Sequence, residues 1–207
     1  SVSVELINVG DNSHIWGAQY NRKLSDLMAV PGDISQEVTE NLRLKLSGDE
    51  KQRLAKRYTN NTEAYQAYLK GRYYTESFTP DGFEKGIEYF NRAIAIEPNY
   101  AQAYAGLAFA YGELAFSDLP PQEALLKARP AAKRALELDE TITEAHLSLA
   151  NISMYYDWDW PAAERELRRA IELSPGDAST HQNYGWYLGL MGRFDESLAE
   201  LKRAQTL

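Results

Sequence analysis

Alanines recur at nearly constant separation through the second half of the chain, and this period constrains the fold more than any other feature. They are Ala93, Ala135, Ala170 and Ala204. The separations are 42, 35 and 34 residues. Five residues after the first three alanines come Pro98, Glu140 and Pro175, where one helix stops before the next begins. A unit of this length cannot bury its apolar face alone, so the period predicts a mostly α fold in which about four helix–turn–helix units stack as a solenoid.

The first helix predicted for each unit carries bulky side chains on both sides of a small or apolar pair. The last unit shows the pattern at spacings of three, one and three residues, with His181, then the pair Tyr184-Gly185, then Leu188. The 42-residue separation exceeds the 34-residue one by eight residues. The extra residues fall around Phe116–Gln122, which predicts a longer loop in the second unit. The predicted units cover residues 62–98, 99–140, 141–175 and 176–207.

This spacing resembles that of tetratricopeptide (TPR) repeats, which are helix–turn–helix units of about 34 residues. The resemblance covers Thr62 to Leu207, and the last three units carry it more closely than the first. It implies a helical scaffold that binds other proteins and is not itself an enzyme.

The residues before the repeats predict a different kind of structure. Ser1–Val9 and His14–Tyr20 alternate apolar and polar side chains around a turn-forming segment, which predicts a β-hairpin. Asp33 is a candidate N-cap for a helix that reaches Leu46. A lone hairpin is marginal in water, so we expect partner strands before Ser1 in a longer parent protein. The predicted parts are a small incomplete α/β portion at 1–47, a short charged helix and linker at 48–61, and the TPR array at 62–207.

A second resemblance concerns this N-terminal part. The run VELINVGDNSHIWGAQYNRKLSDLMAV, then DISQEVTENLRLKLSGDEKQRLAKRY and AYQAYLKGRYY, is similar to the latter half of the TolB-N-terminus-like domain. That domain precedes such repeats in bacterial serine/threonine kinases, adenylate cyclases and winged-helix regulators. The resemblance implies that the chain is an accessory region of a signalling protein whose catalytic or DNA-binding domain lies upstream.

Charge and composition exclude several classes of function. The chain has 22 basic and 30 acidic residues, a net charge of −8, which argues against binding to nucleic acid. No cysteine is present, and no apolar run approaches the roughly 18 residues of a membrane span. We expect a cytoplasmic protein without a cofactor, or a periplasmic one if a membrane span precedes it in the parent.

No group of residues predicts catalysis or metal binding. The phosphate-binding glycine loops and the Gly-x-Ser-x-Gly elbow are absent from the sequence. His146 and His181 take the bulky packing position of their repeats, so we expect them to be structural. Asp159 precedes Trp160-Pro161 and is predicted to cap a helix rather than to form a catalytic pair with Asp157.

The first helices of stacked repeats line a concave face, and side chains not needed for packing point into it. The predicted partner-binding groove comprises Phe109, Glu113, Asn151, Met154, Tyr155, Gln182, Trp186 and Leu190. It is apolar and aromatic and lacks lysine and arginine, which argues against a clamp for a peptide's terminal carboxylate. We expect a protein or peptide partner with aromatic anchors.

Other occupants and functions stay open at this point. The groove is equally open to the parent's own upstream domain or to a second copy, and the last helix is expected to expose a face that self-associates. The alternative function is a small-molecule sensor with its ligand near Trp16, Trp158 and Trp160.

Overall fold

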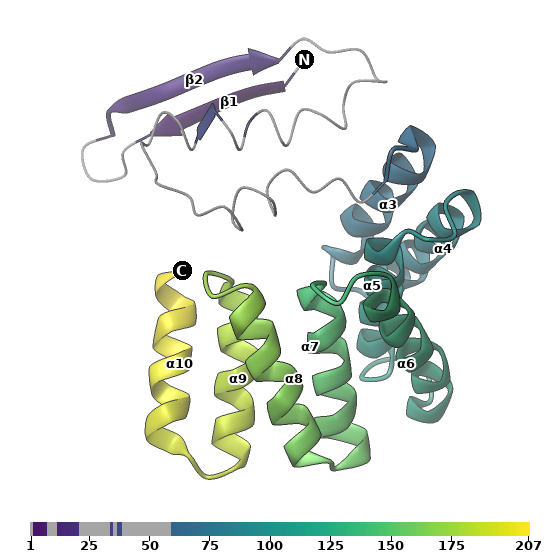
Figure 1. Ribbon diagram of the computed structural model, residues 1–207, viewed down its shortest axis with the longest axis vertical. Helices are drawn as coiled ribbons and strands as arrows, with labels where there is room; N and C mark the ends of the chain where they lie inside the picture. The colour runs from purple at the N-terminus through teal and green to yellow at the C-terminus, as the bar shows by residue number, and fades with distance from the viewer. Residues whose placement is uncertain (1, 8–11, 21–33, 35–36, 39–58) are drawn as a thin grey trace. The chain divides into compact units, whose positions relative to one another are not determined.

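The computed structural model describes residues 2–7, 12–20, 34, 37–38 and 59–207. The chain divides into two compact units, Ser1–Tyr65 and Gln66–Leu207, and each is described by itself. The second unit holds the helical array, with helix α3 crossing the boundary (Figure 1).

The N-terminal unit contains the predicted hairpin. Strand β1 (Val2–Ile7) pairs antiparallel with β2 (His14–Tyr20), from Val2 opposite Tyr20 to Leu6 opposite Trp16. The register shifts between Leu6 and Ile7. Of the helix predicted to start at Asp33, only Ile34, Glu37 and Val38 are described, and they are helical; its remainder and the short charged helix lie outside the described residues.

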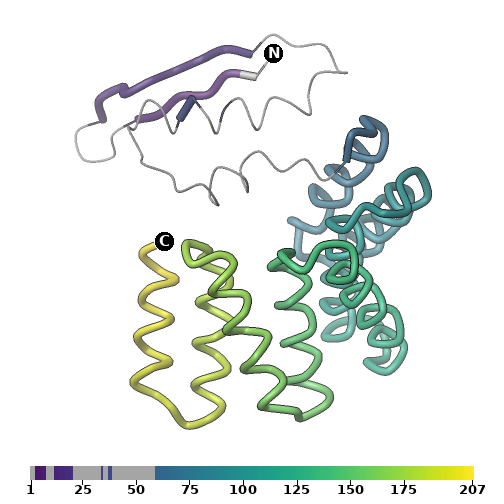
Figure 2. The backbone as a smooth tube through the Cα atoms, in the orientation of Figure 1, coloured from purple at the N-terminus to yellow at the C-terminus, as the bar shows by residue number. Residues whose placement is uncertain are grey.

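Four helix pairs follow one another from residue 62 onward, which confirms the mostly α repeat architecture. The helices are α3 (Thr62–Thr75), α4 (Pro80–Ile96), α5 (Ala101–Leu114), α6 (Pro121–Leu138), α7 (Thr143–Ile152), α8 (Trp160–Leu173), α9 (Ala178–Leu190) and α10 (Phe194–Thr206). Helices α7 to α10 run up and down side by side in chain order (Figure 2).

Polar side chains and prolines fix where several helices begin. The side chain of Asn61 accepts hydrogen bonds from the amides of Glu63 and Ala64 at 3.0 and 3.1 Å. Asp159 accepts from the Ala162 amide at 3.0 Å, which confirms its predicted capping role at α8. Such caps satisfy amides that have no partner inside the helix. The other caps are Thr79 on α4 and Asp177 on α9, and proline stands in the first turn of α4, α6 and α8.

Small residues let the helices approach closely. Ala93, Ala135 and Ala170 are completely buried, as the repeat period predicts. Phe90 is also completely buried, and a Cβ added to Gly71 or Gly106 would lie 2.5 or 2.6 Å from its ring. Interiors packed this tightly tolerate little change in volume, so the core depends on small residues at these positions.

Two segments depart from the regular repeat. The connection between α5 and α6 spans residues 115–120, which confirms the longer loop expected in the second unit. After α7 the chain forms a π-helical turn, η2 (Ser153–Asp157), closed by a hydrogen bond from the Trp158 amide to the Ser153 carbonyl. Trp158 has φ +56°, a left-handed conformation that is uncommon for a residue with a side chain. The irregular segments are therefore the turns of two successive repeats, the second and the third.

Candidate functional site

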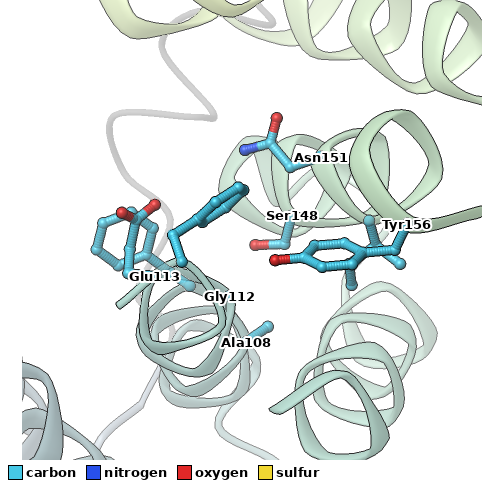
Figure 3. A pocket seen from close by; sticks show the side chains of 9 residues that line it. Ala108, Gly112, Glu113, Ser148, Asn151 and Tyr156 are labelled. Atoms are coloured by element: carbon cyan, nitrogen blue, oxygen red, sulfur yellow. The ribbon is translucent and has the colours of Figure 1, made fainter. Parts of the chain in front are cut away.

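A small pocket, partly open to solvent, lies between the first helices of the second and third repeats. Figure 3 shows its lining side chains. They are Ala108, Phe109, Gly112 and Glu113 of α5, Phe116 of the following loop, Ser148, Asn151 and Ile152 of α7, and Tyr156 of η2. Its enclosed space is small, so the pocket suits one side chain better than a large molecule.

Aromatic rings from the two irregular segments meet at this pocket. The Phe116 ring lies 5.3 Å from that of Tyr155 in an edge-to-face contact and 5.8 Å from that of Tyr156. Phe116 is 57% exposed although it contacts both tyrosines. The π turn delivers two consecutive tyrosines to the loop, and π turns are frequent at functional sites.

Glu113 contributes a carboxylate that no cation of the described chain neutralises. Partial burial raises the pKa of this carboxyl group. Glu113 also lies in the last turn of α5, where the helix dipole disfavours negative charge. Burial, followed by the charge of Glu113, raises the pKa of the Tyr155 and Tyr156 hydroxyls. The fold therefore holds this carboxylate in an unfavourable place, which is a mark of functional sites.

Polar groups of α7 and η2 face Glu113 across the pocket. Figure 3 shows Ser148 and Tyr156 on the side opposite Glu113, with Asn151 above them. The Ser148 hydroxyl donates to the Glu144 carbonyl at 2.9 Å, which leaves its oxygen free to accept. The Asn151 Oδ1 atom is buried and has no hydrogen-bond partner in the described part of the chain. An unsatisfied buried acceptor costs about 1–3 kcal/mol.

An ion pair fixes the end of the π turn. Arg129 of α6 donates to both carboxylate oxygens of Asp157, at 2.8 and 2.7 Å. This hydrogen bond, with the charge of Arg129, holds the pKa of Asp157 below its usual range. The two-point contact is a specific geometry, and it ties η2 to the second repeat. Asp157 thus has a structural ion-pair partner in Arg129.

The predicted groove residues fall into three groups: those at the pocket, those on α9, and Met154. Phe109, Glu113 and Asn151 line the pocket, and Tyr155 contacts its Phe116 wall. The three α9 positions, all exposed, lie outside the pocket. They are Gln182, Trp186 and Leu190.

Met154 is a wrong prediction. It is completely buried in a core cluster with Ala150, Leu167 and Leu188, and so it cannot line a surface groove. Its spacing of four residues from the buried Ala150 places it on the stripe that faces α8 and α9. The flexible thioether side chain fills the core beneath the π turn.

The sequence reasoning missed six of the nine residues that line the pocket. Three of the six carry a ring or a hydroxyl group, namely Phe116, Ser148 and Tyr156. Phe116 stands in the inserted loop, so the eight-residue excess was a signal that pointed to it. Tyr156 belongs to η2, a π-helical turn that was not predicted from the sequence. Only the π-helical hydrogen bond, which the sequence does not show, aims its ring at the loop.

The two repeat histidines have structural partners, as predicted. His146 Nδ1 lies 2.7 Å from Glu166 Oε2, and its Nε2 lies 3.0 Å from the Glu140 carbonyl. His181 repeats the arrangement with Glu200 at 2.5 Å and the Pro175 carbonyl at 3.0 Å. Each imidazole joins the two helices of its own repeat and the turn before them.

Within the described ranges, no cluster of three or more histidine, aspartate or glutamate side chains is placed to bind a metal ion. The described helices also include none with the length and apolar character needed to cross a membrane.

Comparison with known proteins identifies the fold. No protein-family model matches the chain. TTC0263, a thermophilic TPR protein of Thermus thermophilus, is similar with a TM-score of 0.60 and 20% identity, over 86% of this chain and 89% of that one. The array of helix pairs is therefore a TPR-type solenoid. MamA of Desulfovibrio magneticus RS-1 is 14% identical over 90% of this chain and 96% of its own, with a TM-score of 0.46.

A sequence relative is a protein assigned as adenylate cyclase 3 in Rhizobium meliloti (strain 1021). The two are 27% identical over 155 residues, which is 72% of this chain and 26% of the relative. The chain thus spans about a quarter of that protein's length.

Proposed function

We propose that this chain is a non-catalytic protein-interaction module, an accessory region of a multidomain bacterial signalling protein. The observation that carries the proposal is the pocket between α5 and α7, which combines the exposed ring of Phe116 with the Glu113 carboxylate, for which the described chain supplies no cation. The TPR-type fold supports a scaffold role. The partial match to an adenylate cyclase supports a signalling parent, as does the resemblance of the N-terminal part to domains of such proteins.

The proposed ligand is an extended or helical polypeptide segment that lies along α5, α7 and α9. Its side chains would meet Phe116 at the pocket and Trp186 on α9, which are 57% and 49% exposed. Large aromatic side chains of this kind carry most of the energy in protein interfaces. The acidic, lysine-free and arginine-free face also supports a partner other than nucleic acid.

Panning a phage library of random dodecapeptides on the immobilised full chain tests the proposal. We expect wild type to enrich a shared motif, and the double variant Phe116→Ala, Trp186→Ala to lose those phages. Leu126→Ala removes a side chain that is 78% exposed on α6 and serves as the matched control. Enrichment that survives the double variant, or that never appears, rejects the interaction groove.

The alternative, a small-molecule sensor, is favoured by the small enclosed space of the pocket. A rise in melting temperature with one compound from a metabolite panel, lost in Phe116→Ala and kept in Leu126→Ala, would favour this alternative over a peptide.

A further inference from the structure

The elements around the pocket contain no positive charge, although the chain has 22 lysines and arginines. The sequences of α5, α7, η2 and α9 include neither residue. The second helices of the four repeats, α4, α6, α8 and α10, each include at least two. Among the helices from α4 onward, the basic side chains are therefore segregated onto the second helices, and the face formed by α5, α7 and α9 attracts cations.

Basic side chains of the neighbouring helices α3 and α6 have other partners. Arg129 forms its two-point ion pair with Asp157, and Lys127 donates to Glu123 at 3.2 Å. Arg72 pairs with Glu144. None of them neutralises Glu113, whose pKa burial raises. A half-buried carboxylate without a partner is best satisfied by a cation that arrives with a ligand.

The remaining pocket walls suit one shape of cation. The rings of Phe109, Phe116 and Tyr156 provide faces on which a planar cation can stack. Acceptors lie on both sides of the space, with the Glu113 carboxylate opposite Ser148 and Tyr156 (Figure 3). A guanidinium group has five donors in a rigid plane and stacks on aromatic rings, whereas a lysine ammonium is a compact and strongly hydrated point charge.

We propose that this pocket receives an arginine side chain of the bound polypeptide, with its guanidinium group on Glu113 and between the aromatic rings. The inference rests on the proposed interaction function and names the ligand chemistry of the same site. Charge complementarity between the cation-free face and a basic segment commits the groove to a polypeptide ligand that carries at least one arginine.

The closing experiment pans the random dodecapeptide library in parallel on wild type, Glu113→Gln and Glu137→Gln. Glu137 lies on α6 with a side chain 63% exposed, so its substitution removes the same charge away from the pocket. We expect wild type and Glu137→Gln to enrich peptides with arginine at one fixed position, and Glu113→Gln to lose them. Circular dichroism of each variant checks that the fold is intact.

A single enriched peptide then isolates the cation. Replacing its arginine by citrulline keeps the shape and removes the charge, and should weaken binding at least about tenfold by calorimetry, with lysine in between. In Glu113→Gln the arginine and citrulline peptides should bind nearly equally, because the two changes remove one interaction.

The outcomes separate this inference from the proposed function. Wild type could enrich peptides that have no arginine at a fixed position. If Phe116→Ala loses these peptides and Glu113→Gln keeps them, the interaction groove is supported and the arginine pocket is overturned. An absence of enriched peptides overturns both. Agmatine, a free guanidinium compound, is the last arm: if it binds as tightly as the peptide, the ligand is a small cation and the polypeptide proposal is overturned.

Discussion

Two glutamates at successive repeat junctions have opposite surroundings. Glu164, where the third repeat meets the fourth, accepts from Arg168 at 2.7 Å and from Arg193 at 3.0 Å. The hydrogen bond from Arg168 is the main cause that lowers the pKa of Glu164. Glu113, where the second repeat meets the third, has no cation of the described chain beside it, and burial raises its pKa. One glutamate is neutralised by two arginines, and the other has no cation of the described chain as a partner.

The same contrast extends to the packing. At the third–fourth junction, two tyrosine hydroxyls point at the Glu164 carboxylate, and a buried core cluster lies beside it. The third and fourth repeats each carry the buried histidine–glutamate pair, whereas Tyr104 stands in the second repeat where His146 stands in the third. At the third–fourth junction the polar groups therefore serve stability, whereas at the second–third junction Glu113 has no cation of the described chain as a partner.

The largest expected effect tests whether stability and binding are divided in this way. Leu167 is completely buried in the third–fourth cluster, so Leu167→Ala should cost roughly 2–5 kcal/mol of unfolding free energy. Phe116→Ala at the pocket should cost less than about 1 kcal/mol, because its ring is mostly exposed. Urea unfolding measures both. Equal costs would mean that the Phe116 ring is part of the core and not of a binding surface.

A second prediction concerns the close helix contacts made by the repeated alanines of the third and fourth repeats. Ala170 is completely buried, so Ala170→Leu should overpack the contact and cost roughly 1–3 kcal/mol. Ala204, the equivalent residue 34 positions later, is only half-buried, and the same substitution there should cost less. Melting temperatures of the two variants give the comparison. If Ala170→Leu melts at the same temperature as wild type, Ala170 does not lie at a close helix contact and the repeat register is wrong.

Regular features were predictable from the sequence because they follow from spacing. The recurring alanines gave the helix pairs, and His146 and His181 were assigned to packing from their place in the repeat. Met154 was misplaced because partner-facing positions were chosen without counting four residues on from the buried Ala150. Tyr156 was missed because a π-helical hydrogen bond has no periodic signature. The pocket lies where the repeat period is interrupted. The period therefore predicted which helices flank the pocket, but not all the side chains that line it.

Removing the charge of Glu164 and removing that of Glu113 should change the free energy of unfolding in opposite directions. Glu164→Gln weakens hydrogen bonds from two arginines and should destabilise the fold by about 1 kcal/mol after solvent screening. Glu113→Gln removes an unpaired, half-buried carboxylate and should be neutral or stabilising by a few tenths of a kcal/mol. Denaturant midpoints at neutral pH measure both changes. A destabilised Glu113→Gln variant would reveal a partner for this carboxylate within the protein.

The smallest expected effect is a difference in pH dependence. The hydrogen bond from His146 lowers the pKa of Glu166, so this group stabilises the fold above its unfolded pKa and the contribution is lost as the pH falls through its folded pKa. Glu113 has a raised pKa and acts in the opposite sense, since protonation relieves its unpaired charge as the pH falls. Unfolding free energies measured from neutral pH down to the acid range should therefore fall less steeply for Glu166→Gln than for wild type, and more steeply for Glu113→Gln. Each slope should differ from wild type by no more than about 1 kcal/mol over the range. Parallel curves for the two variants would contradict the contrast between a satisfied and an unsatisfied carboxylate.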